Sequence, residues 1–416
     1  MEGFQKIRLD RLFYEVKERV PAAELELLTP STVYGVIPQS KLKSKPQQAL
    51  RDDYEVTPAN CDDFIISMSS FRHGLEYCGI SGGISPDYVV LRSFIGKELI
   101  QFLKYSLKSL FLIENLTLYR TGIRQGQRLQ WNKVRYIKIP IPSIQYAKMI
   151  TPFLDQEIKR IDKLIEKKHQ LIKLLEEKIK SEINEAFDGI SKTIRLKNLA
   201  KVQLSNVDKH LFDNEIPVTA CHYTDVYYND IITDQTELRK GSVSPLEKEK
   251  FSLYGGEVII TKDSESPEDI AIPAYVKSCK ENTVCGYHLS IIRALKNVAD
   301  GGYIFWVLQT KKIRDYFYIS AQGVTRFGLP LNKISGCLIP HVEDLEEQKR
   351  ISEKLFKIRN NQIEVSEKIQ SSIKKLKELR TSLINEAVTG QLDIEKWQNR
   401  NNTDQNLEKI NKTMTA

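Results

Sequence analysis

Leu129–Pro140 reads LQWNKVRYIKIP, and Leu329–Pro340 reads LPLNKISGCLIP, a second version of the same pattern. The leucine, the Asn-Lys pair, the aliphatic residue after it and the closing Ile-Pro recur in order, 200 positions apart. Self-similarity at a fixed offset is typical of a duplicated structural unit. The pair therefore predicts that the chain contains two copies of one unit.

The repeat extends outward from these stretches in both directions. Ile183–Ala186 (INEA) with Gly189 recurs as Ile384–Ala387 with Gly390, and Ile7–Leu9 with Leu12 recurs as Ile194–Leu196 with Leu199. The chain is therefore predicted to be a pseudo-twofold tandem repeat, in which each copy is a globular part followed by a helical part.

Each helical part carries an apolar stripe with a spacing of three and four residues, interrupted once by a polar residue, Lys168 or Gln362. This spacing is typical of a long amphipathic helix. We predict two helical segments, 149–189 and 343–396, in which the long helix is stopped by a glycine, Gly189 or Gly390. A narrow apolar stripe on a long helix is buried by packing against another helix, and the helix of the other copy can provide this surface. We therefore expect an antiparallel intramolecular coiled coil. The alternative is that each stripe packs only on its own globular part.

The globular parts, head 1 (1–148) and head 2 (190–342), mix short β-rich runs with helical ones. We predict strands at 63–68, 88–92, 257–261 and 289–293 and helices at 97–111 and 302–318. The expected fold class is α+β: two mixed α/β domains separated by two long antiparallel helices. The tail 397–416 is polar and is predicted to lack stable structure.

Charge and composition limit the possible functions. The 416-residue chain has a formal net charge of +8, and residues 1–148 hold 21 lysine and arginine against 15 aspartate and glutamate. Basic residues without acidic ones between Asn115 and Lys148 indicate an anion-binding surface. The absence of a long apolar run predicts a cytoplasmic protein. Six scattered cysteines are expected to be reduced packing residues.

Motifs for covalent chemistry are weak in this sequence. There is no GxxxxGK[ST] phosphate loop. Ser85–Tyr88 (SPDY) lies near the [DNS]PP[YF] pattern of adenine methyltransferases but has Asp87 where the second proline belongs, so we interpret it as a turn before a strand. Cys279, Cys285 and His288 match no standard zinc spacing and are expected to be buried packing residues. We expect no metal and no catalytic residue on this chain.

Recognition residues concentrate just before the repeated Asn-Lys motif. Tyr119–Trp131 (YRTGIRQGQRLQW) combines arginines and glutamines with glycines, and the second copy has Gln322–Gly328 (QGVTRFG) in the matching place. Arginine suits the acceptor edge of guanine and glutamine suits adenine. The DNA-binding candidates are Arg120, Arg124, Gln125, Arg128 and Gln130 in the first copy, and Gln322, Thr325 and Arg326 in the second. The alternative is a basic surface that contacts phosphates alone.

Weaker candidates follow one strand in each head. Arg72 and His73 come after the strand around Ile65, and Lys262 to Glu265, including Ser264, come after the strand around Ile259. We expect the two groups to occupy matching places.

With this plan, the chain resembles the specificity subunits of type I restriction-modification systems over residues 1–396. The marks are Glu346–Ile351 (EEQKRI) after Ile339-Pro340, Leu383–Ile394 (LINEAVTGQLDI), Gly286–Leu289 (GYHL) and Gly323–Leu329 (GVTRFGL). The resemblance adds His288 to the DNA-binding candidates. The first copy departs at 143–146 (SIQY), where only Gln145 answers the Glu-Gln pair.

The resemblance implies a function in defence against foreign DNA. Each head would read one half of a bipartite site in double-stranded DNA, and the helices would set the gap. It also implies two modification subunits that methylate adenine with S-adenosylmethionine and two restriction subunits that use ATP and Mg²⁺, so no cofactor is expected on this chain. The alternatives are a non-enzymatic coiled-coil adaptor with two ligand-binding heads and an enzyme with an unrecognised site.

Overall fold

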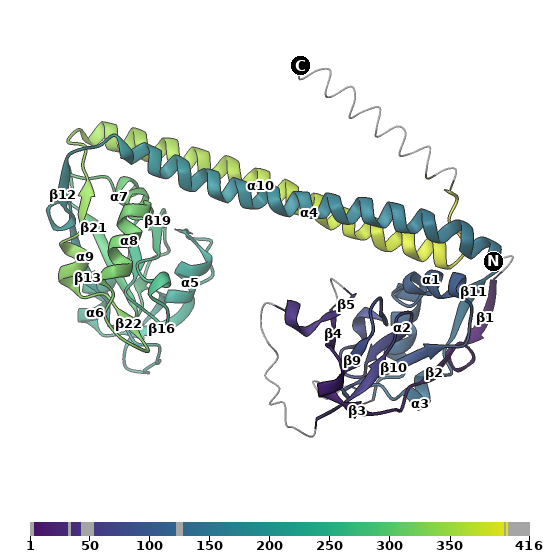
Figure 1. Cartoon of the computed structure of the whole chain (residues 1–416). Coiled ribbons are helices and arrows are strands. Elements are labelled where there is room, and N and C mark those ends of the chain that lie inside the picture. The colour runs from purple at the N-terminus through teal and green to yellow at the C-terminus, as the bar shows by residue number, and fades with distance from the viewer. Residues whose placement is uncertain (1–3, 32–34, 43–53, 122–127, 395–396, 398–416) are drawn as a thin grey trace, which may run out of the picture. The chain divides into compact units, whose positions relative to one another are not determined.

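The structure is a computed structural model that describes residues 4–31, 35–42, 54–121, 128–394 and 397 (Figure 1). The chain forms two compact units. Unit 1 comprises Met1–Lys167 with Ser371–Ala416, and unit 2 comprises Lys168–Gln370. Each unit therefore combines one head with part of both long helices.

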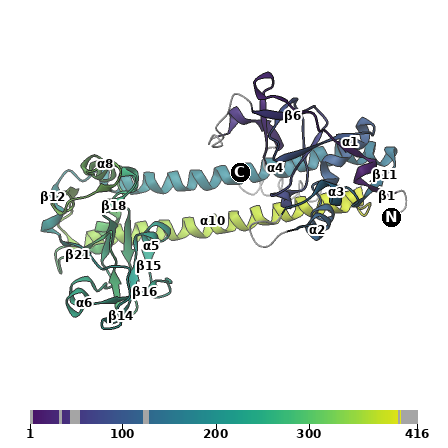
Figure 2. The same cartoon turned by 90° about the horizontal axis from the view of Figure 1, so that it is seen from below.

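The long helices are α4 (Ile144–Asp188, 45 residues) and α10 (Leu345–Val388, 44 residues), which Figures 1 and 2 show as continuous helices. In unit 1, the beginning of α4 shares a core with the end of α10. In unit 2, the end of α4 shares a core with the beginning of α10. The two helices therefore run antiparallel, which confirms the predicted fold class.

Local sequence explains where these helices begin and end. Ser143 Oγ accepts from the Tyr146 N–H at 3.2 Å, so α4 begins at Ile144, and it contains Pro152 in its third turn. Asp344 Oδ1 accepts from the Glu346 N–H at 3.0 Å before α10. Gly390 follows α10 with φ +71°, and a Cβ there would lie 2.5 Å from the Phe4 ring, so this position requires glycine.

The apolar stripes pack on both a head and the other helix. Leu154, Ile158 and Ile161 of α4 lie in the same buried cluster as Leu383 and Ala387 of α10 and the core of head 1. The alternative in which each stripe packs only on its own head is therefore wrong.

The described strands of head 1 form three sheets. A strand pair joins β1 (Phe4–Arg8) to β11 (Lys138–Pro142). A four-stranded sheet has the order β2 (Phe13–Glu15), β10 (Tyr88–Ser93), β7 (Phe64–Ser67) and β8 (Glu76–Tyr77). A five-stranded sheet has the order β3 (Val20–Pro21), β6 (Glu55–Ala59), β9 (Gly82–Ile84), β4 (Leu27–Ser31) and β5 (Gly35–Pro38).

Head 2 repeats part of this plan. A strand pair joins β12 (Thr193–Arg195) to β23 (Leu338–Pro340). A five-stranded sheet has the order β13 (Ala200–Leu204), β21 (Leu289–Ala294), β17 (Val258–Thr261), β19 (Pro273–Val276) and β15 (Ile231–Ile232). Beside it lie the sheet β16 (Arg239–Val243), β14 (Ile216–Cys221), β20 (Thr283–Cys285) and the pair β18 (Asp263–Ser264) with β22 (Phe327–Gly328). Head 2 also contains the short helices α5 (Tyr223–Tyr228) and α6 (Pro245–Phe251).

The four predicted strands are confirmed as β7, β10, β17 and β21. They form the same pairings in both heads. β10 lies between β2 and β7, and β21 lies between β13 and β17, with all four contacts antiparallel. The duplication is therefore structural as well as sequential.

Each of the two helices predicted in the heads, at 97–111 and 302–318, is broken into two helices in the structure. The first is α1 (Lys97–Ser106) with α2 (Leu110–Leu118), and the second is α7 (Gly301–Leu308) with α8 (Lys311–Ser320). Periodicity missed the break because the apolar spacing continues across it. Ser109 ends the first run by accepting from the Leu112 N–H, which starts a new helix. The short helix α3 (Trp131–Val134) and its counterpart α9 (Leu331–Ser335) carry the repeated Asn-Lys motif.

Two smaller expectations change. Cys61 is exposed, so the packing interpretation is wrong for it, whereas Cys78, Cys221, Cys285 and Cys337 are buried. Gln348 is fully buried on the first turn of α10, where it accepts from the Asp300 N–H and donates to the Val342 carbonyl. The matching buried position of α4 is Ala147, not Gln145.

Candidate nucleic-acid interface

We call Tyr119–Trp131 of head 1 and Gln322–Gly328 of head 2 the reading stretches. The backbone attaches them to the same place in both heads. The Leu129 N–H donates to the Met68 carbonyl just after β7, and the Leu329 N–H donates to the Lys262 carbonyl just after β17, both at 2.8 Å. A single antiparallel bridge closes each stretch, Thr121 with Arg128 and Gln322 with Gly328. Each reading stretch therefore lies at the end of the equivalent strand of its own head, β7 in head 1 and β17 in head 2.

This anchoring corrects one expectation about matching places. Because Met68 matches Lys262, Ser70 matches Ser264. Arg72 and His73 lie further along, in the single turn Phe71–His73, which matches the turn Pro267–Asp269 of head 2. Arg72 and His73 are exposed and line neither of the clefts described next.

Head 1 has a cleft of 540 Å³ at this place, which we call the head-1 cleft. Arg128 reaches it from the reading stretch, and Ser85–Tyr88 border it from the turn before β10. The complete lining is Leu28, Thr29, Gln39, Ser67, Met68, Ser69, Ser70, Ser85, Pro86, Asp87, Tyr88 and Arg128. The SPDY turn thus belongs to the same cleft as a predicted DNA-binding arginine.

Head 2 has a cleft of 440 Å³ at the matching place, the head-2 cleft. It brings together three residues that the sequence singled out separately: Ser264, His288 and Arg326. The complete lining is Tyr223, Tyr227, Asp263, Ser264, Glu265, Ser266, Asp269, His288 and Arg326. The pairing of β18 with β22 holds the two sides of this cleft together.

The side chains of the head-2 cleft are tied to one another. His288 Nδ1 lies 3.0 Å from Asp263 Oδ2, and Lys262 Nζ lies 3.5 Å from the same oxygen. The Tyr227 hydroxyl lies 3.4 Å from Ser264 Oγ and donates to the Asp269 carbonyl at 3.2 Å. Partial burial raises the pKa of Tyr227, so its hydroxyl remains a hydrogen-bond donor at neutral pH.

Cations and aromatic rings surround the head-2 cleft. Lys262 Nζ lies 5.0 Å from the centre of the Tyr287 ring, and Lys209 Nζ lies 5.4 Å from the centre of the Tyr223 ring. Cations over aromatic faces with open space beside them suit contact with a polyanion that carries planar bases.

The other predicted site residues that the structure describes line neither cleft. Arg120, Gln130, Gln322 and Thr325 are exposed within the reading stretches, and Lys262 is half-buried at the edge of the head-2 cleft. Arg124 and Gln125 lie outside the described residues.

Sequence reasoning missed Asp87, Tyr223 and Tyr227 as cleft residues, whereas Asp263 lies within the predicted candidates Lys262 to Glu265. A usable signal existed for Asp87, because the turn before a strand recurs in both copies and ends in Asp87 in one and His288 in the other. The tyrosines could not be found, because α5 has no counterpart among the helices of head 1 in the part that the structure describes.

Among the described residues, no group of three His, Cys, Asp or Glu side chains has an arrangement that could hold a metal ion. Cys285 is completely buried, Cys279 Sγ contacts the Leu253 carbonyl, and His288 is engaged by Asp263. Within the same residues, no helix is both long and apolar enough to cross a bilayer.

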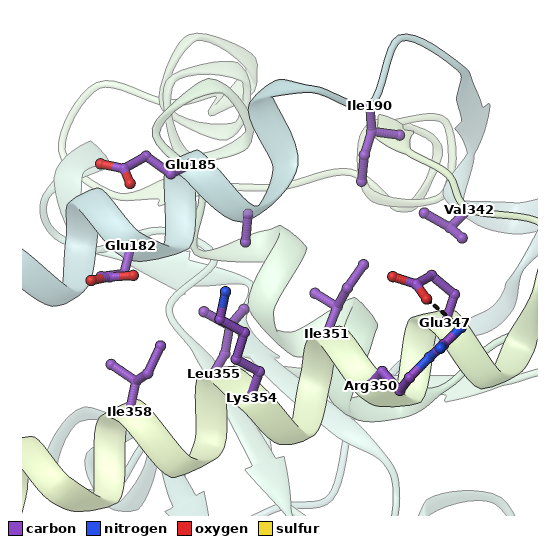
Figure 3. A pocket seen from close by; sticks show the side chains of 11 residues that line it. Glu182, Glu185, Ile190, Val342, Glu347, Arg350, Ile351, Lys354, Leu355 and Ile358 are labelled. Atoms are coloured by element: carbon purple, nitrogen blue, oxygen red, sulfur yellow. Dashed lines mark ion pairs between the residues drawn. The ribbon is translucent and has the colours of Figure 1, made fainter.

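A separate groove of 610 Å³ lies between the long helices in unit 2 (Figure 3). Its apolar floor includes Ile351, Leu355 and Ile358 of α10, and its rim carries Glu182 and Glu185 of α4. Lys354 and Arg350 add positive charge on the α10 side. In unit 1, the Trp397 indole N–H donates to Glu157 Oε2 of α4 at 3.2 Å, and the Trp397 ring packs on the core cluster of head 1.

No protein-family model matches the sequence, and no curated protein matches it. Solved structures do match. One, described as "Structural basis underlying complex assembly and conformational transition of the type I R-M system", has a TM-score of 0.72 at 15% identity and covers 94% of this chain and 99% of its own. The HsdS subunit from Thermoanaerobacter tengcongensis has a TM-score of 0.52 at 14% identity, covering 94% and 98%.

A third match, the type I restriction-modification system S subunit from M. genitalium, has a TM-score of only 0.36 at 15% identity, covering 92% of this chain and 96% of its own, and adds no support. The first two matches span nearly the whole length of both chains, heads and helices together. The chain therefore has the fold of the HsdS subunit of type I restriction-modification systems.

Proposed function

We propose that this chain is the sequence-specific DNA-binding subunit of a type I restriction-modification complex, with each head reading one half of a bipartite site. The observation that carries the proposal is the pair of matched clefts. They lie at the same place in two copies of one domain and each includes an arginine, yet the head-1 cleft has four serines and one acidic residue, Asp87, whereas the head-2 cleft has three acidic residues and His288. Two clefts at equivalent positions with different side chains are suited to recognising two different base sequences.

The charge distribution supports DNA as the ligand. The chain carries a net charge of +8, and the excess is largest in residues 1–148. Basic groups release counterions from the phosphate backbone and supply affinity without sequence preference, whereas the cleft side chains supply the preference. The likeness in fold to HsdS adds weight, because it covers both heads.

The partners belong to the same proposal. Two modification subunits, each with S-adenosylmethionine, would dock beside the helices and heads, and two restriction subunits would use ATP and Mg²⁺. The groove in Figure 3 is an open surface on the helices that such docking would cover. This chain would perform no covalent step and would bind no cofactor itself. It would act in the cytoplasm.

A selection experiment tests the proposal. The chain, co-purified with its modification partner, is incubated with a library of random-sequence duplexes, and the bound DNA is sequenced. We expect two short preferred blocks separated by a gap of fixed length. Replacing residues 1–148 with the corresponding head of another specificity subunit should change one block and leave the other.

The outcomes separate the alternatives. DNA binding without any preferred block would indicate a phosphate-binding surface, and a change in both blocks after exchange of one head would contradict independent reading. No binding to DNA, with or without the partner, would overturn the proposal itself.

A further inference from the structure

Asp87 and His288 occupy the same place in the two clefts. Asp87 directly precedes Tyr88, which pairs with Ser67 at the start of β10, and His288 directly precedes Leu289, which pairs with Thr261 at the start of β21. Both residues line their cleft. The duplicated fold therefore places Asp87 of head 1 and His288 of head 2 at equivalent positions.

Asp87 presents hydrogen-bond acceptors. Its side chain is exposed, and its turn is shaped by Ser85, whose Oγ lies 3.4 Å from Asp87 Oδ2 and from the Asp87 backbone nitrogen. An ionised carboxylate can only accept hydrogen bonds. The Asp87 side chain therefore offers acceptors at this point of head 1.

His288 is held so that it also offers an acceptor. Asp263 engages its Nδ1 at 3.0 Å, and an ionised carboxylate beside Lys262 requires that nitrogen to carry the proton. In the neutral ring, Nε2 then has a free lone pair, and the structure records no partner for it among the described residues. The ring is 7% exposed and packs against Tyr223 and Tyr287, with centroid separations of 5.8 and 3.9 Å.

The backbone at His288 adds an independent observation. Its φ is +70°, in the left-handed region that favours glycine. A buried histidine in this conformation is retained against a local energetic cost, which is typical of residues that serve a site.

We infer that Asp87 and His288 determine specificity by accepting a hydrogen bond from an exocyclic amino group, adenine N6 or cytosine N4, of one base pair in each half-site. This inference rests on the proposed function. In the major groove only these two bases present an amino donor, whereas guanine O6 and N7 and thymine O4 are acceptors that would oppose a carboxylate or an imidazole lone pair. Asp263 is a positioning residue that fixes the protonated nitrogen of His288.

The test uses the complete chain with its modification partner and its selected DNA site. Adenine is replaced by purine and cytosine by 2-pyrimidinone, one position at a time, which removes a single amino group. One position in each half-site should then lose about tenfold in affinity for the unaltered protein. His288→Gly should lower the preference at the head-2 position by about the same factor, and removal of the amino group should then have no further effect.

Glycine is the suitable substitution because it accepts the left-handed backbone. Asn297→Gly is the matched control, since Asn297 has φ +62°, is exposed in head 2 and lies outside the cleft. Asp87→Ala should affect one position of the other half-site only. His288→Asn, which also tolerates this backbone, replaces the glycine variant if that one unfolds.

The outcomes distinguish a failure of the proposed function from a failure of the inference about Asp87 and His288. If the unaltered protein selects no sequence, the proposed function fails. If it selects a site but the folded His288 and Asp87 variants keep every preference, or if no amino group of the site contributes to affinity, the inference fails and the proposed function stands.

Discussion

The side chain of Asn385, near the end of α10, accepts a hydrogen bond at 3.0 Å from the backbone N–H of Leu110, the first residue of α2. The equivalent contact joins α4 to head 2. Asn184, near the end of α4, accepts at 2.8 Å from the N–H of Lys311, the first residue of α8. The first N–H groups of a helix have no partner within it. Each INEA motif therefore completes a helix in the head of the other copy.

Asn385→Ala should destabilise unit 1, because the Leu110 N–H loses its partner. Loss of a helix-capping interaction costs about 1 kcal/mol, and chemical denaturation of the complete chain should show a lower midpoint. Asn184→Ala should have a similar effect on unit 2. The control is Asn361→Ala, since Asn361 lies on an exposed part of α10. Equal stability of the Asn361 and Asn385 variants would remove the capping role.

Leu383→Ala should destabilise unit 1 more strongly. Leu383 is completely buried in the cluster that joins α10 to α4 and to head 1, whereas Leu379, one turn earlier, is 41% exposed. Truncation of a buried leucine costs about 2 to 5 kcal/mol, and truncation of the exposed one should cost less than about 1 kcal/mol. Denaturant unfolding followed by the fluorescence of Trp131 would measure the difference in a variant in which Trp306 and Trp397 are replaced by Phe. Similar losses for both leucines would show that α10 does not form part of the core of unit 1.

The sequence was sufficient to predict the duplication, the two long helices and four of the head strands, because these depend on repetition and on apolar periodicity. It failed at the breaks between α1 and α2 and between α7 and α8. There the apolar spacing continues across the break, and the partners of the new helix starts, Asn385 and Asn184, come from positions far away in the chain. Such long-range contacts leave no local pattern.

For the candidate site, the sequence predicted the reading stretches but not the clefts. Arg128 and Arg326 were named from residue type, Ser264 from its place after a strand and His288 from the family resemblance. The cleft linings show which of them lie together. Asp87 was interpreted as part of a turn, which is correct for its backbone. Its relation to His288 depends on the pairing of β10 with β7 and of β21 with β17, which residue type alone does not specify.

Arg326→Ala should weaken specific DNA binding more than nonspecific binding. Arg326 lines the head-2 cleft beside Ser264 and Asp263, where a base edge rather than a phosphate is expected. A good base contact contributes about 1 to 3 kcal/mol of discrimination, so affinity for the selected site should fall about tenfold or more while affinity for random DNA changes little. Arg124→Ala is expected to act in the same way in head 1.

Salt dependence provides the control for these arginine variants. A phosphate contact contributes to the slope of log affinity against log salt, whereas a base contact changes that slope little. Lys197→Ala, an exposed lysine outside the cleft, serves for comparison. Equal losses on specific and random DNA, with a reduced slope, would place Arg326 on the backbone of the DNA.

Head 2 should lose stability in mild acid because of His222. This residue is 5% exposed, its Nδ1 is buried with no hydrogen-bond partner among the described residues, and burial lowers its pKa below the usual 6.5. Below pH 6.5 the unfolded chain then binds a proton that the folded chain does not bind, so the free energy of unfolding falls as the pH decreases toward the lowered value. His222→Gln should flatten the pH dependence of unfolding in this window, measured at several pH values between 5 and 8. His169→Gln, an exposed histidine on α4, should leave the dependence unchanged. If the two variants show the same pH profile, the acid sensitivity of head 2 arises elsewhere.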